Sequence, residues 1–183
     1  MLLLINKSDN PKIVYSCFYA LGIFSLESND WLFENYEKTI TDTFLTFFQK
    51  ENFSSVTNIA LQSFINFYEK SDRNDYLLLR QLKLFEYFFK NISLNKFVFI
   101  KENSVKAISS CLVCLKNRII KENLYFIIES LVQLAHNYLQ LENYENCKAC
   151  ILEAIYYCLD SIFKFEFTDL ISEERLSLIL KVL

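Results

Sequence analysis

Residues 75–90 read Asp-Tyr-Leu-Leu-Leu-Arg-Gln-Leu-Lys-Leu-Phe-Glu-Tyr-Phe-Phe-Lys. Apolar residues recur in this stretch at the spacing of one face of an α-helix: Leu78, Leu82, Phe85 and Phe89. A second face carries basic and aromatic residues: Arg80, Lys83, Tyr87 and Lys90. The pattern predicts an amphipathic helix whose apolar face packs inward and whose basic face is free for solvent or a partner.

Similar patterns precede this stretch. Asn10 can cap a helix that starts at Pro11, because its side chain accepts hydrogen bonds from unpaired backbone N–H groups. The apolar positions expected to follow are Val14, Cys17, Leu21 and Phe24. Asp30 is expected to cap a second helix, from Trp31 to about Gln49. Ser54 or Ser55 is expected to start a third, through Ile59 and Phe67.

The chain beyond residue 90 continues the helical pattern with one exception. Lys96–Ile100 is strand-like, and we interpret it as a buried connector. The next helix has its inward positions in phase: Val105, Ile108, Leu112 and Leu115. Three more helices are predicted, from about Leu124 to Gln140, from about Tyr144 to Phe163, and from near Ser172.

Composition favours an all-helical fold. The 183 residues include one Gly and one Pro, the residues on which tight hairpins and bulges depend. Hydrophobic residues make up 52% of the chain, far too many for a disordered segment. Eight helices in pairs that repeat every ~40 residues are typical of HEAT-like units. We therefore expect residues 1–183 to form a single all-α domain, about four antiparallel helix pairs stacked as a HEAT-like α-solenoid.

The formal net charge of −3 hides a basic region in the middle of the chain. Residues 80–121 include nine basic residues and two acidic ones. The basic residues are Arg80, Lys83, Lys90, Lys96, Lys101, Lys106, Lys116, Arg118 and Lys121. Clustered Lys and Arg bind nucleic-acid phosphates by releasing counterions, without reading bases. These nine are candidate DNA-phosphate contacts, and the alternative is an ordinary solvated helix face.

The sequence gives little support for a catalytic site or a metal site. Cys111 and Cys114, like Cys147 and Cys150, have the spacing of zinc ligands, but both pairs fall inside helical runs, where buried Cys packs as a small hydrophobe. Core packing is the preferred interpretation, with a metal or redox site as the alternatives. His136 is expected to be a partly exposed helix residue, since no partner for general-base work is evident. We expect no enzyme, no catalytic residue, no metal and no cofactor.

Two further features bear on location and class. The apolar start of the chain is too short for a signal peptide, and no apolar run reaches the length of a membrane span, so an intracellular protein with reduced Cys is expected. Residues 134–154 roughly follow the spacing of one tetratricopeptide unit, but no second copy occurs. Close packing of two antiparallel helices explains this single match more simply.

Seven segments, taken in order, resemble the C-terminal HEAT region of the condensin G subunit family. They are Asn10–Val14, Ala20–Leu26, Asn29–Trp31, Ile59–Ile65, Leu82–Phe85, Ala107–Ile119 and Glu145–Ile151. The resemblance covers roughly residues 8 to 165 and implies that the chain is the C-terminal part of a longer subunit.

The resemblance also implies a role and partners. It implies a non-catalytic scaffold in mitotic chromosome condensation that binds a kleisin subunit, other condensin subunits and, non-specifically, double-stranded DNA. The expected location is the nucleus and chromosome, with a cytoplasmic pool possible, and neither a membrane nor a small-molecule substrate is expected as a partner. The alternative is a tetratricopeptide or armadillo-like adaptor that binds proteins without touching DNA.

Overall fold

The computed structural model describes residues 1–50, 53–69, 75–115 and 126–133, with single positions at 149, 152, 156, 173 and 177. All regular structure within these residues is α-helical, which confirms the all-helical prediction. The helices are α1 (Leu2–Lys7), α2 (Pro11–Glu27), α3 (Asn29–Phe48), α4 (Ser54–Tyr68), α5 (Asp75–Leu94) and α6 (Val98–Leu115), and residues 126–133 are helical as well.

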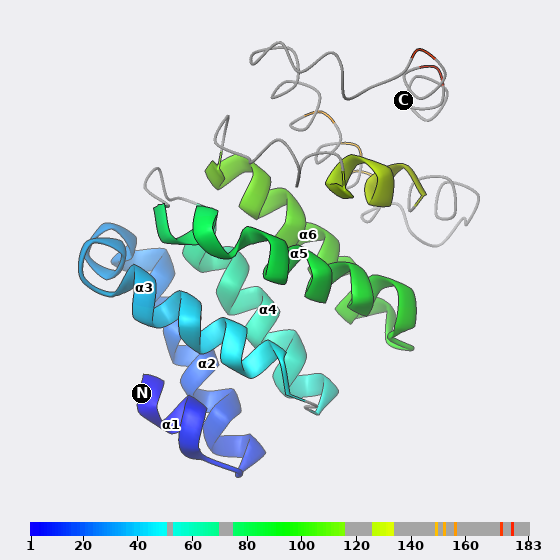
Figure 1. Ribbon diagram of the computed structural model, residues 1–183. Coiled ribbons are helices and arrows are strands. Elements are labelled where there is room, and N and C mark those ends of the chain that lie inside the picture. The colour runs from blue at the N-terminus through cyan, green and yellow to red at the C-terminus, as the bar shows by residue number, and fades with distance from the viewer. Residues whose placement is uncertain are drawn as a thin grey trace.

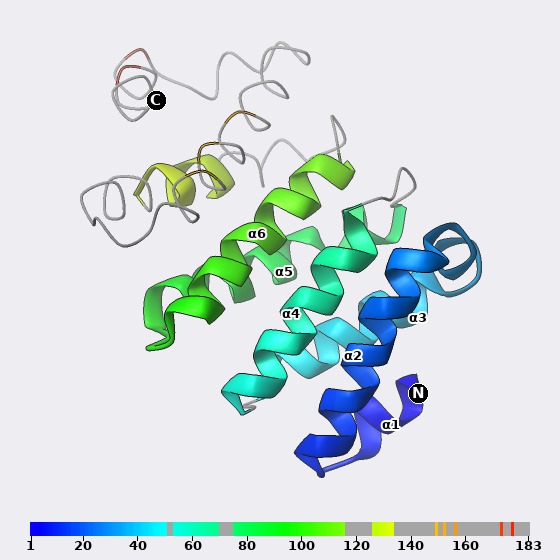
Figure 2. The same cartoon turned by 180° about the vertical axis from the view of Figure 1, so that it is seen from behind.

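The helices form two rows (Figures 1 and 2). In one row α2, α4 and α6 lie side by side and run in the same direction. In the other row α3 lies beside α5, and α5 packs closely on α6. The short helix α1 contacts both α2 and α3 at one end of the molecule. No helix in the described part of the chain is long and apolar enough to cross a membrane.

Helix α2 begins as predicted. The Asn10 side chain accepts a hydrogen bond from the backbone N–H of Lys12 at 3.0 Å, and Pro11 occupies the first helical position. The predicted apolar stripe of α2 is only partly right, because Val14 and Leu21 are buried but Phe24 is 54% exposed. The buried face is centred on Phe18, which the sequence analysis left out of the stripe.

Hydrogen bonds fix how α2 and α4 lie against each other. The buried Ser63 hydroxyl donates to the backbone oxygen of Phe18 at 2.7 Å, and Asn66 Nδ2 donates to the oxygen of Gly22 at 3.4 Å. A Cβ atom at Gly22 would lie 3.2 Å from Ser63 Oγ. The one glycine of the chain therefore lies where two helices approach closely.

Aromatic rings join α3, α4 and α5. The ring of Phe64 on α4 lies 5.2 Å from that of Phe44 on α3 and 5.3 Å from that of Phe88 on α5, between ring centroids. Phe33 stacks on Phe67 at 4.3 Å, which adds a second α3–α4 contact. Aromatic pairs in these geometries add to the free energy of burial. The core is therefore continuous from one row of helices to the other.

Helices α5 and α6 correct two sequence predictions. Phe85 and Phe89 of the predicted α5 stripe are buried, but Leu82 is 42% exposed, so its assignment to the core was wrong. The buried face of α5 instead includes Leu84 and Phe88. The connector expected at Lys96–Ile100 was also wrong, because α6 already begins at Val98. The side chain of Leu78 lies outside those the structure describes.

The inward positions predicted for α6 are confirmed: Val105, Ile108, Leu112 and Leu115 are all fully buried. The third predicted helix corresponds to α4, and part of the predicted sixth is present at residues 126–133. Helix α1, which buries Ile5, was not predicted. The rest of the sixth helix and the seventh and eighth lie almost entirely outside the described residues.

Candidate nucleic-acid interface

The predicted basic region lies on two helices and the turn between them. Six of its nine basic residues are described: Arg80, Lys83 and Lys90 on α5, Lys96 in the turn, and Lys101 and Lys106 on α6. The other three, Lys116, Arg118 and Lys121, lie outside the described residues. The six described residues differ in exposure and in the side chains that they contact.

Arg80 is held by side chains of its own and a neighbouring helix. Its Nη2 atom donates to the hydroxyl of Tyr76 at 3.0 Å, and its Nε atom lies 3.8 Å from Asp42 Oδ1 on α3. Tyr76 in turn donates to Asp42 at 2.7 Å. The hydrogen bond with Tyr76, and to a smaller extent the charge of Asp42, raise the pKa of Arg80. Arg80 therefore links α5 to α3, while its side chain is 40% exposed.

Tyr87 is also engaged with α3. Its ring stacks on that of Phe48 with 4.5 Å between centroids, and burial raises the pKa of its hydroxyl. The face of α5 predicted to be free is thus partly occupied, since both Arg80 and Tyr87 contact α3. The side of α5 that carries Arg80 and Tyr87 therefore lies next to α3.

Lys83 and Lys90 are the best-placed candidate phosphate contacts among the six described basic residues of this region. Both are exposed, and because they are seven residues apart on α5 they project on the same side, about 10 Å from each other. That spacing allows both ammonium groups to contact one nucleic-acid backbone. Glu86, also exposed, lies one turn before Lys90 and reduces the local positive charge.

The remaining lysines do not extend this surface in a simple way. Lys96 is exposed, and its ammonium group lies 5.2 Å from the ring centroid of Phe97. Lys101 and Lys106 are half-buried, and helix geometry places them about 140° apart around α6. Among the six described basic residues, Lys83 and Lys90 therefore form a pair on α5, and Lys96, Lys101 and Lys106 do not lie together on one face.

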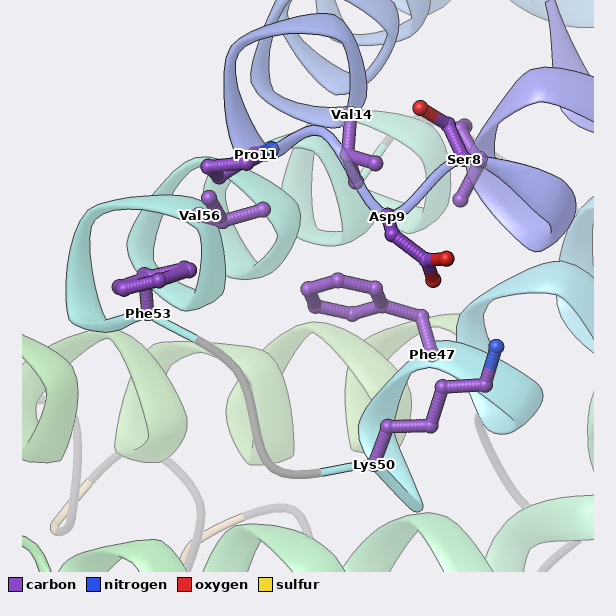
Figure 3. Close-up of a pocket in the computed structure, with 9 residues that line it drawn as sticks. Ser8, Asp9, Pro11, Val14, Phe47, Lys50, Phe53 and Val56 are labelled. Carbon is purple, nitrogen blue, oxygen red and sulfur yellow. The ribbon is translucent and has the colours of Figure 1, made fainter.

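A hollow of about 380 Å³ lies where α1, α2, α3 and α4 meet (Figure 3). Its wall is mainly apolar, and Asp9 and Lys50 border it next to the ring of Phe47. Phe53, at its α4 side, is 68% exposed. The lining residues are Ile5, Ser8, Asp9, Pro11, Val14, Phe47, Lys50, Phe53 and Val56. The hollow has no local sequence signal, because its walls come from segments up to about 50 residues apart.

The described cysteine pair lies in the core, as predicted. Cys111 and Cys114 on α6 are buried, and burial, with a smaller effect of Cys114, raises the pKa of Cys111 well above 9.0. Within the described residues no group of three or more His, Cys, Asp or Glu side chains is arranged to hold a metal ion. Cys147, Cys150 and His136, and most of the single tetratricopeptide-like match, lie outside these residues.

Some polar side chains of the core form hydrogen bonds between helices, whereas the buried Asn91 Nδ2 and Ser104 Oγ atoms have no hydrogen-bond partner among the described residues. Tyr68 is fully buried and its hydroxyl shares a hydrogen bond with Thr41, while burial raises its pKa well above 10.0. A carboxylate oxygen of Glu37 accepts a hydrogen bond from the backbone N–H of Leu77 at 3.3 Å, in the first turn of α5. These hydrogen bonds hold α3 against α4 and α5.

Comparison with known proteins gives no relative. No protein-family model, no curated protein and no solved structure matches this chain.

Proposed function

We propose that this chain is a non-catalytic HEAT-type α-solenoid scaffold, similar to the condensin G subunit, that holds a kleisin chain and duplex DNA in mitotic chromosome condensation. The observation that carries the proposal is the register of the helices in the α2, α4 and α6 row. Residues joined by hydrogen bonds are 45 and 44 positions apart between α2 and α4, and 45 apart between α4 and α6.

A constant offset between parallel neighbours is what repeating helix pairs produce. HEAT and armadillo units repeat every ~40–47 residues, whereas tetratricopeptide units repeat every ~34. Contacts in the second row have smaller and more variable separations, from 34 positions between Asp42 and Tyr76 to 40 between Phe48 and Phe88, so the first row alone carries the inference of a repeat. The offset favours HEAT or armadillo-like units over tetratricopeptide units.

Duplex DNA is the partner that the lysine pair on α5 supports. Lys83 and Lys90 project together from the second row, where a repeat scaffold presents one helix of each pair. Two such contacts give weak, sequence-independent binding. Full strength therefore requires the kleisin or further subunits to add contacts.

The alternative is a protein-binding adaptor without DNA contact. The hollow of Figure 3 favours it, because a mainly apolar concavity of about 380 Å³ is large enough to receive a side chain of a bound protein segment. Arg80 also favours the adaptor, because its guanidinium group contacts Tyr76 on α5 and Asp42 on α3.

Salt-dependent DNA binding separates the two. The variant Lys83→Glu/Lys90→Glu, purified with its co-purifying partner, is compared with the parent on a fluorescent duplex between about 50 and 200 mM salt. We expect weaker binding and a log–log salt slope reduced by about 1.8, because each phosphate contact contributes about 0.9.

The matched control is Lys7→Glu/Lys12→Glu, which reverses two exposed lysines on α1 and α2. It should bind DNA like the parent, and both variants should keep the parent's partners and helicity. If Lys83→Glu/Lys90→Glu binds DNA with the parent's affinity and slope, or if the parent does not bind DNA, the DNA role is dropped and the adaptor remains. Mass spectrometry of proteins purified with the tagged chain identifies a kleisin or contradicts the condensin-like role.

A further inference from the structure

Four large apolar side chains are exposed where α5 ends and where α4 and α6 begin. Leu94, the last residue of α5, is 75% exposed, and Phe53, immediately before α4, is 68% exposed. Val98 and Phe99, the first two residues of α6, are each 42% exposed. Single exposed apolar residues are common, but a group of large ones marks an interaction surface.

The register of α4 and α6 brings these residues to the same edge. Asn103 donates to Asn58 at 2.6 Å, so positions 45 residues apart lie level on the two parallel helices. By the same offset Phe53 lies level with Val98. Two views show the start of α4 and the α5–α6 turn at one end of the molecule (Figures 1 and 2).

Basic residues lie close to Leu94, Val98 and Phe99, whereas Phe53 lines a hollow that both Asp9 and Lys50 border. Lys96 is exposed in the turn and Lys101 lies one turn into α6. No acidic residue occurs between Tyr87 and Lys101, and none is present in the first turn of α4 or α6. The nearest acidic residues along the chain are Glu86 and Glu102, with Glu51 ahead of Phe53.

We propose that this edge docks on the surface of an anionic lipid bilayer. Leu94, Phe53, Val98 and Phe99 would enter the boundary between headgroups and acyl chains, and Lys96 and Lys101 would contact the anionic headgroups. Leu94, the most exposed of the four, and Val98 are aliphatic and cannot stack with bases as the aromatic rings of a single-strand site do. A bilayer is a partner that the sequence analysis did not expect.

Sedimentation of the full chain with lipid vesicles tests the proposal. One set of vesicles is phosphatidylcholine alone, and the other contains about 30% phosphatidylserine. We expect the chain to sediment with the phosphatidylserine vesicles, to do so less with neutral vesicles, and to be released by salt. Leu94→Ser/Phe99→Ser should lower partitioning at least tenfold, because burial of one such side chain contributes about that factor. Lys96→Gln/Lys101→Gln should lower it about fivefold per lysine.

The matched control is Phe24→Ser/Trp31→Ser, which removes two apolar side chains that are 54% and 58% exposed elsewhere. It should sediment like the parent, with all variants checked for parental helicity. Absence of sedimentation with phosphatidylserine vesicles overturns the proposal, and so does equal loss in the control variant or parental binding by Leu94→Ser/Phe99→Ser. The DNA test uses Lys83 and Lys90 and leaves this edge intact, so the two proposals fail independently.

Discussion

Burial of a side chain depends on where the neighbouring helices lie. Leu112 on α6 is fully buried, whereas Leu82 on α5 is 42% exposed. Both leucines fall on helical stripes of the sequence, yet only one lies between helices. A charge introduced at the two positions therefore has very different consequences.

We expect Leu112→Asp to lower the free energy of unfolding by about 4 kcal/mol or more, because the carboxylate would be buried without a partner. Leu82→Asp serves as its matched control and should cost about 1 kcal/mol or less. Urea unfolding followed by circular dichroism measures both. Equal losses in the two variants would contradict the burial assigned to these residues.

The buried Cys111 thiol and the buried Tyr68 hydroxyl lead us to expect a loss of stability at alkaline pH. Burial raises the pKa of Cys111 well above 9.0 and that of Tyr68 well above 10.0. Above pH 9 the unfolded chain releases the Cys111 proton while the folded chain keeps it, so the folded state binds more protons and stability falls as pH rises. Each proton contributes a slope of about 1.4 kcal/mol per pH unit.

Guanidinium unfolding at pH 8, 9.5 and 10.5 should therefore give a decreasing free energy of unfolding. Tyr68→Phe, which removes one of the two groups, should show a shallower decrease above pH 10 than the parent. Identical pH profiles of variant and parent would exclude Tyr68 from the effect.

At the scale of helices, the contact of α2 with α4 depends on a residue without a side chain. A Cβ atom at Gly22 would lie 3.2 Å from the hydroxyl and 3.4 Å from the Cα atom of Ser63. The hydroxyl already donates to Phe18, so it cannot move away without losing a buried hydrogen bond. A larger residue would push the helices apart.

Gly22→Leu should consequently destabilise the fold. Overpacking costs about 1–3 kcal/mol or more, against a gain of about 1 kcal/mol in helix propensity. Ala20→Leu, half-buried on another side of α2, is the control and should be neutral or slightly stabilising. Thermal unfolding compares the two, and a Gly22→Leu melting temperature at or above the parent's would contradict the close approach.

Sequence analysis predicted the helices better than it predicted their inward faces. The Asn10–Pro11 start and the buried positions of α6 follow from local rules, and both are confirmed. Phe24 and Leu82 were assigned to the core because several stripes of an apolar helix fit the same spacing, and only the neighbouring helices decide which one is buried. The prediction of a strand-like connector at Lys96–Ile100 was wrong because its β-forming residues from Val98 onward belong to α6, where tertiary packing outweighs β propensity.

The candidate site shows a similar division. The basic region could be found by counting charges, but the capture of Arg80 by Asp42 depends on a contact between residues 38 positions apart. The same holds for the hollow of Figure 3 and for the exposed edge at Leu94 and Val98. Such contacts depend on how neighbouring helices lie against each other, which composition and periodicity do not determine.

For the whole molecule, the central claim is that neighbouring helices of the first row run parallel with an offset of 44–45 residues. This arrangement places the starts of α2 and α4 side by side and their ends side by side. Exposed positions at the four ends are Lys12 and Glu27 for α2, and Ser55 and Glu69 for α4. Neighbouring helix axes are about 8–10 Å apart, whereas opposite ends of these helices are about 20 Å apart.

Distances between pairs of spin labels at these positions, measured by electron paramagnetic resonance, test the claim most directly. Labels are attached to genetically encoded keto side chains, so that the six native cysteines are unchanged. We predict that the Lys12–Ser55 and Glu27–Glu69 pairs are each about 10 Å closer than the crossed pairs Lys12–Glu69 and Glu27–Ser55. Crossed pairs as close as, or closer than, the same-end pairs would contradict the parallel register and with it the proposed repeat architecture.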